Sequence, residues 1–283
     1  MRNMQNQKYA FIGCQSEYKG SRIVLFGAPF DGTSSYRAGS RSAPSSIRME
    51  SQGIETYSPY LGKDLAETAV FDRGDLELPM GNARQALRII RKNTASILDD
   101  GKKPFMIGGE HLVTLGAFEA AAEKYQDLCL IHFDAHTDLR EDYLGEKLSH
   151  ATVVKRIWEI TGDNRIFQFG IRSGMKEEFE WAKKHTCLTR FNFGGLSEAI
   201  QKIKDKPVYL TIDFDVLDPS EMPGTGTPEA GGVRYKELFD AIRAVSACNV
   251  VACDVVELCP PLDNSGISVA LACKLLREIL LQL

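Results

Sequence analysis

Reactive side chains gather at three points of the sequence, and each point follows an apolar run. The point with the most reactive side chains is Asp134-Ala135-His136-Thr137-Asp138, which comes directly after Ile131-His132-Phe133. Side chains of an extended strand alternate between two faces, so Asp134, His136 and Asp138 are predicted to project to the same side. Buried charges of this kind are tolerated when they are paired or bind a metal. For this segment alone, a set of polar capping residues in a surface loop is the alternative.

The other two points carry the same types of side chain. Asp213 and Asp215 share a face in the run Leu210–Val216, although one such pair is a weak signal because turns are rich in Asp. Gly108-Gly109-Glu110-His111 follows the run Phe105–Ile107, and its glycines permit a tight strand-to-helix turn that leaves the histidine at its lip. Taken alone, this histidine is better explained as the first residue of a helix.

Considered together, the three points offer two imidazoles and four carboxylates. They are His111, His136, Asp134, Asp138, Asp213 and Asp215. Six ligands are too many for one tetrahedral zinc, and no thiolate is among them. Oxygen-rich sites with some imidazole suit a harder ion such as Mn²⁺, and six residues can hold two ions if two carboxylates bridge. Paired ions lower the pKa of a shared water toward about 7, which supplies a hydroxide nucleophile. The residues therefore predict a hydrolase.

The surrounding chain predicts the elements that position these residues. Short apolar runs are expected as strands at Arg22–Gly27, Thr68–Asp72, Pro104–Gly108, Leu128–Asp134, Ile166–Gly170, Pro207–Phe214 and Val250–Val256. Helix-period stretches are expected at Ala83–Asp99, Thr114–Tyr125, Ala151–Ile160, Lys176–Lys184, Tyr235–Val245 and Ser268–Leu281. Strands that are apolar on both faces and alternate with helices indicate a parallel sheet covered on both sides, hence a three-layer α/β fold. Ligands of such sheets bind outside the carboxyl ends of the strands, where all three points lie.

Composition excludes several other classes of protein. The 283 residues are 43% hydrophobic and 25% charged, as in globular proteins, and the net charge of −4 argues against a nucleic-acid binder. No apolar run approaches the roughly 20 residues of a bilayer span, and the polar segment Met1–Lys8 leads into no signal-type stretch, so a cytoplasmic location is expected. The seven cysteines are scattered and are interpreted as free thiols. With no linker or repeat, residues 1–283 are expected to form a single domain.

The three motifs, in this order, resemble the metal signatures of the ureohydrolases, the family of arginase, agmatinase and their relatives. The resemblance covers nearly the whole chain, from Gly27-Ala28-Pro29-Phe30-Asp31 to Glu257 and Pro260-Pro261. It implies a three-layer α/β/α fold around an eight-stranded parallel sheet, a binuclear manganese centre, and hydrolysis of a guanidino or formimino group. It also implies a homo-oligomer, a trimer or a hexamer.

Position by position, the resemblance divides the ligands between two manganese ions. One ion is assigned to His111, Asp134, Asp138 and Asp213. The other is assigned to His136, Asp134, Asp213 and Asp215, with Asp134 and Asp213 bridging. The family does not use the position of His132 for metal, so we interpret His132 as a hydrogen-bonded core histidine.

Two further residues match family positions near the metals. His150 matches a histidine that shuttles protons, although Ala151 stands where the family usually has glycine, and Glu257 matches the carboxylate that pairs with the guanidinium. Both are predicted to bind substrate, and with the ligand Asp138 they form the predicted catalytic set. Asp254, deeper in its strand, is expected to make a structural hydrogen bond. Two ions, four aspartates, a hydroxide and Glu257 leave a net charge of about −2, which attracts a cation.

The loops indicate which guanidino compound is the substrate. Pro223–Glu229 resembles agmatinases, and Arg140 stands where arginases have the asparagine that holds an amino-acid head group. Agmatine is therefore the predicted substrate, with putrescine and urea as products, which implies a role in polyamine biosynthesis. Arg140 leaves an alternative open, because it could face a carboxylate tail as on guanidinobutyrate or guanidinopropionate; it could also be a solvated loop cation or an inter-subunit ion pair. Arginine is a further alternative substrate.

Two other classes of protein share some of these features. A metal-binding but inactive homologue is possible in principle, yet all the ligands, His150 and Glu257 are present. A binuclear phosphoesterase needs more ligand histidines than the five in the chain. The charged stretch Met175–Lys184, which includes Glu178, is expected to be a solvated helix face with supporting ion pairs.

Overall fold

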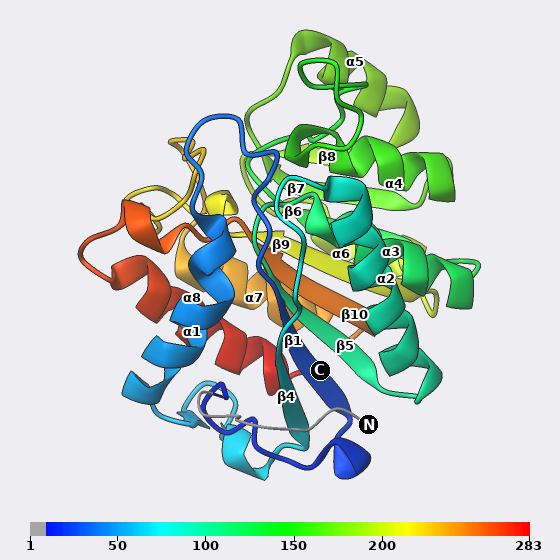
Figure 1. Cartoon of the computed structure of the whole chain (residues 1–283). Helices are drawn as coiled ribbons and strands as arrows, with labels where there is room; N and C mark the ends of the chain where they lie inside the picture. Colours follow the sequence, from blue (N-terminus) through cyan, green and yellow to red (C-terminus); the bar gives the residue numbers. More distant parts are fainter. Residues whose placement is uncertain (1–9) are drawn as a thin grey trace.

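The structure, a computed structural model that describes residues 10–283, is built on an eight-stranded parallel sheet (Figure 1). Its strands, in sheet order, are β4 (Val70–Asp75), β1 (Ile23–Ala28), β5 (Lys103–Gly108), β10 (Asn249–Val256), β9 (Pro207–Asp213), β6 (Cys129–Phe133), β7 (Ile166–Ile171) and β8 (Cys187–Arg190). The central strands are apolar and buried on both faces, as the sequence predicts. The segment Met1–Lys8, for which no signal-type stretch is expected, lies outside the described residues.

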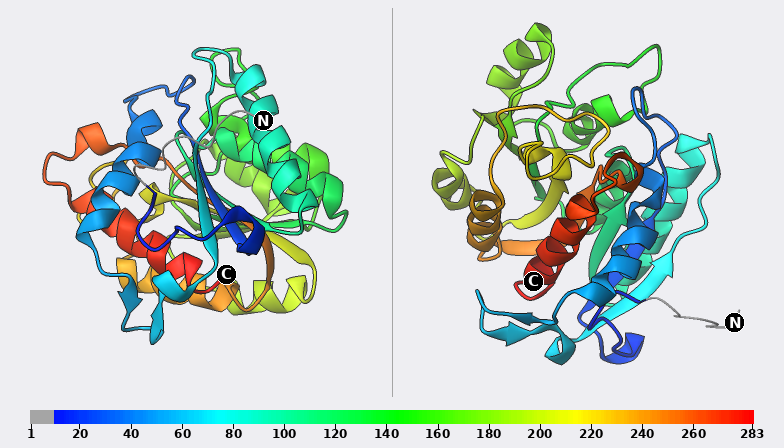
Figure 2. Two further views of the ribbon diagram at one scale, coloured as in Figure 1. Left: turned by 60° about the horizontal axis from the view of Figure 1, so that its bottom comes forward. Right: turned by 90° about the vertical axis from the view of Figure 1, so that its left-hand side faces the viewer.

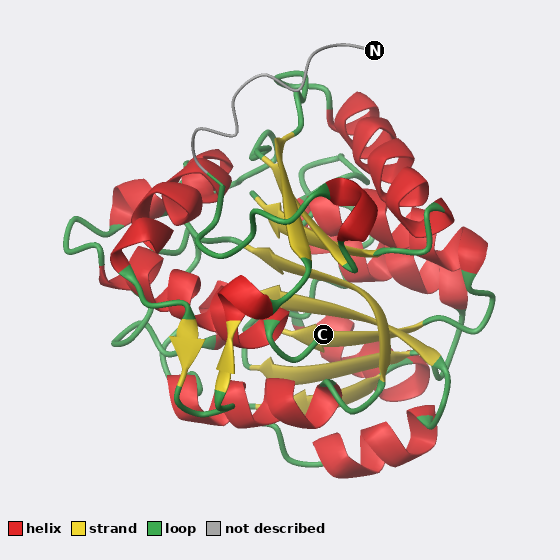
Figure 3. Cartoon of the chain, turned by 90° about the horizontal axis from the view of Figure 1, so that it is seen from below, coloured by secondary structure: helices red, strands yellow, loops and turns green. Residues whose placement is uncertain are grey.

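Helices cover both faces of the sheet and enclose a separate hydrophobic core on each (Figures 1 and 3). One face is covered by α1 (Ala43–Glu50), α6 (Leu196–Ile203), α7 (Tyr235–Val245) and α8 (Ile267–Leu280). The other is covered by α2 (Ala83–Asp99), α3 (Val113–Lys124), α4 (Val153–Thr161) and α5 (Lys176–His185). Helices α1 and α8, from opposite ends of the chain, pack side by side (Figure 2, right). The three-layer fold predicted from the sequence is confirmed.

Three elements of these layers carry no clear sequence signal. Strand β8 lies at the edge of the sheet and is only partly buried, so it has no continuous apolar run. Helices α1 and α6 have only eight residues each, which is too short for a strong helical periodicity. The two-stranded hairpin of β2 (Tyr57–Ser58) and β3 (Lys63–Asp64) also escapes detection.

The reactive segments follow three of the four central strands. The strands β5, β10, β9 and β6 are neighbours in the sheet and run in parallel, so their carboxyl ends meet at one edge. His111 follows β5, Asp134 follows β6, and Asp213 ends β9. Glu257 comes directly after the fourth strand, β10. The fold thus gathers segments that are up to about half the chain apart in sequence.

Two sequence expectations concern the rest of the chain. All seven cysteines are free thiols, as predicted, and five of them are buried. Among residues 10–283, no helix combines the length and the apolar character that crossing a bilayer requires.

Candidate metal centre and active site

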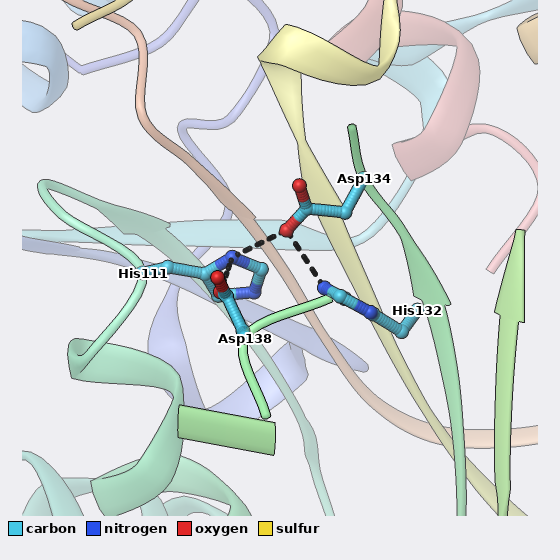
Figure 4. A group of neighbouring side chains, drawn as sticks. All are labelled: His111, His132, Asp134 and Asp138. Atoms are coloured by element: carbon cyan, nitrogen blue, oxygen red, sulfur yellow. Dashed lines mark hydrogen bonds and ion pairs between the residues drawn. The ribbon is translucent and has the colours of Figure 1, made fainter. Parts of the chain in front are cut away.

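A strand-to-helix turn places His111 among three carboxylates. At Gly109 a side chain is excluded, because a Cβ there would lie 2.1 Å from the carbonyl oxygen of Phe30. The turn carries His111 Nδ1 to 3.0 Å from Asp134 Oδ2 and 3.2 Å from Asp213 Oδ2. Asp138 Oδ2 is 3.3 Å from the same nitrogen (Figure 4). These four residues are the set that the resemblance assigns to one ion.

A second group lies beside the first and shares Asp134 with it. His136 Nδ1 is 3.0 Å from Asp215 Oδ2 and 3.5 Å from Asp134 Oδ1. Asp134 therefore directs one oxygen toward His111 and the other toward His136. This is the arrangement that a carboxylate bridging two ions requires.

The loop after β6 positions its ligands differently from the sequence prediction, which placed three of them on one face of a strand. Strand β6 ends at Phe133, so Asp134, His136 and Asp138 lie beyond it. The backbone N–H of His136 donates to Asp134 Oδ1, and Asp138 has a left-handed φ of 52°. Backbone turns, and not strand alternation, bring these side chains together. The three side chains do converge, but the reason that the sequence analysis gave for their convergence was wrong.

The same correction applies to the pair after β9. Asp213 is the last residue of the strand, and Asp215 lies in a short 3₁₀ helix, Phe214–Val216. The Asp215 N–H donates to Asp213 Oδ1 over 2.8 Å. Asp215 Oδ1 in turn accepts from the Ala135 N–H over 3.1 Å, which ties this helix to the loop after β6.

The donors fit divalent metal ions. The buried Nδ1 of His111 has no hydrogen-bond partner in the described structure, although three carboxylates face it. Burial and the neighbouring Asp134 carboxylate raise the pKa of Asp138 well above its usual value, and burial and Asp215 do the same for Asp213. So many buried carboxylates require cations nearby. Carboxylate and imidazole donors without thiolates suit Mn²⁺.

Four of the six candidate ligands line a cavity of about 640 Å³: His111, His136, Asp138 and Asp213. Asp134 and Asp215 lie in contact with these histidines. Glu257 and His150 line the same cavity, together with Arg140 and Tyr143. Thus the structure brings all eight predicted site residues to one place. Asp254 and His132 lie deeper and are fully buried, and both are hydrogen-bonded as predicted.

Glu257 is held at the cavity wall by a backbone contact. It follows β10 with a left-handed φ of 65°, and its Oε1 accepts from the His111 N–H over 2.7 Å. Its Oε2 has no hydrogen-bond partner in the described structure. Burial, reinforced by the charge of Glu110, raises the pKa of Glu257 to about 8. A cation bound beside this carboxylate would offset the free-energy cost of burying its negative charge.

His150 stands at the start of a 3₁₀ turn, His150–Thr152, and its ring is held by hydroxyl groups. Its Nε2 lies 3.2 Å from Ser35 Oγ, and its Nδ1 lies 3.3 Å from Ser149 Oγ. Burial lowers the pKa of His150 to about 4. The imidazole is therefore neutral at pH 7 and can accept a proton.

Sequence reasoning missed a brace that connects the two sides of the cavity. The buried Glu110 accepts from the N–H of Thr33 over 2.8 Å and from its hydroxyl over 2.6 Å. Thr33 Oγ1 also accepts from the backbone N–H of His150 over 3.1 Å. Glu110 thus joins the loop before His111 to the loop that carries His150. Its place inside the Gly-Gly-Glu-His motif was the one signal that could have revealed it.

The other charged residues of α5 are exposed as expected, and Lys183 pairs with Glu180, but Glu178 departs from this expectation. Glu178 is buried, and its carboxylate accepts from Thr137 Oγ1, Leu139 N and Met175 N. These hydrogen bonds fasten the end of the loop after β6, which carries Asp134, His136 and Asp138, to α5. A glutamate at the third helical position signals a capping role, and that signal was overlooked.

Arg140 lines the cavity and already has partners. Its guanidinium carbon lies 4.6 Å from the centre of the Tyr143 ring, and its Nε lies 3.9 Å from Glu178 Oε2. Its side chain is 34% exposed. Arg140 is therefore a half-buried cavity residue and not a fully solvated loop cation.

Comparison with known proteins agrees with this geometry. The model of the arginase family matches residues 21–282. The agmatinase of Bacillus anthracis is 49% identical over 276 residues, covering 96% of this chain and 95% of the relative, and that of Bacillus subtilis is 48% identical over 275 residues, with 96% and 95% coverage. The crystal structure of agmatine ureohydrolase from Thermoplasma volcanium superposes with a TM-score of 0.90 at 35% identity, covering 99% of this chain and 95% of that one. The chain therefore belongs to the arginase family and is a ureohydrolase.

Proposed function

We propose that the protein hydrolyses agmatine to putrescine and urea at a centre of two manganese ions. The convergence of six acidic and imidazole ligands with Glu257 and His150 on one cavity is the observation that carries this proposal. Similarity to two agmatinases along almost the whole chain supports agmatine as the substrate.

The chain offers one set of donors to each ion, and the two sets share Asp134 and Asp213. One ion would be held by His111, Asp138 and the two shared aspartates, whose oxygens lie close to His111 Nδ1. The other would be held by His136, Asp215 and the same two aspartates. The chemistry that two bound manganese ions supply is a hydroxide nucleophile at neutral pH.

Glu257 binds and orients the guanidinium group. Its Oε1 is engaged by the His111 backbone, and its Oε2 is open to accept a charge-assisted hydrogen bond from the substrate. Because His111 N and Glu257 are in direct contact, the guanidinium is held at a fixed position relative to the turn that carries His111. The planar cation also offsets the desolvation cost of the buried Glu257 carboxylate.

His150 moves the proton that the reaction requires. Attack of one water on the guanidinium carbon breaks the bond to the alkyl-bearing nitrogen, and urea and an alkylammonium ion are the balanced products. The neutral imidazole of His150 takes up the proton released by the nucleophile and delivers it to the leaving nitrogen. Hydroxyls of Ser35 and Ser149 hold the ring in place for both transfers.

The cavity rim favours a substrate with a cationic tail. Glu229 lines the cavity, its Oε1 accepts from Ser173 Oγ over 2.9 Å, and it has no cationic partner in the described structure. Two arginines line the cavity, and both already have partners. Arg140 is opposed by Tyr143 and Glu178. Arg37 donates to the carbonyl oxygens of Thr225 and Gly226. An ammonium tail therefore meets a carboxylate without an ion-pair partner, whereas a carboxylate tail would have to draw an arginine away from its partners.

Urea release from a panel of substrates tests the proposal. Manganese-loaded enzyme is assayed with agmatine, arginine, guanidinobutyrate and guanidinopropionate at equal concentrations. We expect agmatine to be hydrolysed fastest. A higher rate on a guanidino acid would reject agmatine and assign Arg140 to the substrate tail, and no urea from any of the four would reject hydrolysis. The homo-oligomer and the cytoplasmic location stay predictions of the sequence.

A further inference from the structure

Four buried polar side chains form a row across the centre of the sheet, directly below the metal ligands. Asp254 of β10 is the register neighbour of Thr211 in β9, which is the neighbour of His132 in β6, which is the neighbour of Gln168 in β7. All four are completely inaccessible to solvent. Burying four polar side chains side by side is costly unless each has hydrogen-bond partners.

At one end of the row, Gln168 determines which nitrogen of His132 carries the proton. Gln168 Nε2 lies 2.9 Å from the carbonyl oxygen of Thr137, which can only accept a hydrogen bond. The amide nitrogen must therefore face that oxygen, while Gln168 Oε1 accepts from the Thr186 hydroxyl over 3.2 Å. The same amide nitrogen lies 3.1 Å from His132 Nδ1, so it donates there and Nδ1 carries no proton.

The proton of His132 consequently lies on the nitrogen that faces the metal ligands. His132 Nε2 is 2.8 Å from Asp134 Oδ2, the oxygen that also faces His111 (Figure 4). His132 is thus a hydrogen-bond donor to the bridging carboxylate. Its proximity to the ligands does not make it a ligand, because the nitrogen that points toward them is protonated.

At the other end of the row, Asp254 and Thr211 set the tautomer of His111. The Tyr209 hydroxyl donates to Asp254 Oδ2 over 2.6 Å, and the Thr211 hydroxyl donates to Asp254 Oδ1 over 2.5 Å. Having given its proton to Asp254, Thr211 Oγ1 can only accept from His111 Nε2, which lies 3.0 Å away. In the neutral imidazole the lone pair is then on Nδ1, the nitrogen that faces Asp134, Asp138 and Asp213.

We propose that the row Asp254–Thr211–His132–Gln168 orients His111 and Asp134 for metal binding by making Nε2 the donor nitrogen of both histidines. The lone pair of His111 is directed at the ligand cluster, and the Asp134 carboxylate is oriented by the proton of His132. All four members are positioning residues, since none of them lines the cavity. The inference rests on the metal centre of the proposed function.

Metal affinity of variants in the row tests this assignment. Manganese is titrated calorimetrically into metal-free protein, and folding of each variant is checked by circular dichroism. Thr211→Val removes the hydrogen bonds of the hydroxyl to Asp254, His111 and Thr114 at nearly constant volume. We expect it to weaken manganese binding about 10- to 100-fold, as loss of a partner of a metal ligand typically does. Thr211→Ser keeps the hydroxyl and should restore most of the affinity, and Gln168→Leu should weaken binding in the same direction as Thr211→Val.

The matched control is Thr94→Val in α2. Thr94 Oγ1 is buried, like that of Thr211, but has no hydrogen-bond partner in the described structure, so this variant should bind manganese as the wild type does. A folded Thr211→Val protein with wild-type affinity would overturn the inference and leave the proposed function intact. A wild-type protein that binds no manganese would overturn the metal centre, and the inference with it.

Neutron diffraction of the metal-free wild type tests the tautomers directly and needs no variant. We expect hydrogen density on Nε2 of both His111 and His132, and none on Nδ1 of His132. Density on Nδ1 of His132, or an absence of density on Nε2 of His111, would contradict the hydrogen-bond directions on which the inference depends.

Discussion

Replacing Glu257 by glutamine removes its negative charge while preserving most of its contacts. The amide oxygen can still accept from the His111 N–H, so the turn that carries His111 should keep its position. What is lost is the charge that faces the guanidinium. A hydrogen bond to a charged group contributes about 1.5 to 3 kcal/mol, and 1.36 kcal/mol corresponds to a factor of ten. We therefore expect kcat/KM for agmatine to fall about 10- to 150-fold.

The assay is steady-state urea release by manganese-saturated enzyme, with metal content measured for each sample. The control is Glu180→Gln, which neutralises an exposed glutamate of α5 that pairs with Lys183 and does not line the cavity, and it should leave kcat/KM unchanged. If Glu257→Gln retained both its metal and the wild-type kcat/KM, Glu257 would not be the partner of the guanidinium. Loss of metal in this variant would instead show that its bond to the His111 backbone supports the ligands.

Further predictions concern the ligands, the proton carrier and the effect of pH. Asp134→Asn and Asp213→Asn should each lose metal and activity together, because each carboxylate serves both ions; a mutant that keeps both ions by elemental analysis would disprove bridging. His150→Ala should lower kcat about 10²- to 10⁴-fold while metal content stays unchanged, and metal loss would make His150 a ligand. In metal-free protein, burial raises the pKa of Glu257 to about 8. Between about pH 4.3 and that value the unfolded chain releases a proton that the folded chain keeps. The free energy of unfolding of the wild type, measured by urea denaturation, should therefore decline relative to that of Glu257→Gln as pH rises. A difference that stays constant with pH would contradict this.

The sheet and most of its helices follow from local patterns in the chain. Apolar runs such as Ile23–Ala28 are buried on both faces, and a periodic stretch such as Ala83–Asp99 is long enough to show its helical repeat. The edge strand Cys187–Arg190 was missed because an edge strand is partly solvated and needs no continuous apolar run. A short apolar run indicates that a strand is buried, and the strands at the edges of the sheet are the least buried.

The candidate ligands were likewise visible in the chain because carboxylates and imidazoles are rare at the end of a buried strand. Their contacts were not visible. The prediction of one strand face for Asp134, His136 and Asp138 failed because turn conformations, including the left-handed φ at Asp138, depend on packing with neighbouring loops. The buried role of Glu178 was missed for the same reason, since its acceptor bonds are to a loop about 40 residues away.

The amino-acid sequence by itself determined the chemistry available to this protein: which donors exist, which strands precede them, and the family in which that order occurs. Only the tertiary structure decided how those donors are used. Asp254, Thr211, His132 and Gln168 lie in four strands, and no spacing along the chain shows that they form a row, because sheet register is set by long-range packing. The direction of each hydrogen bond in that row, and so the proton position of each histidine, depends on partners that only folding brings within reach.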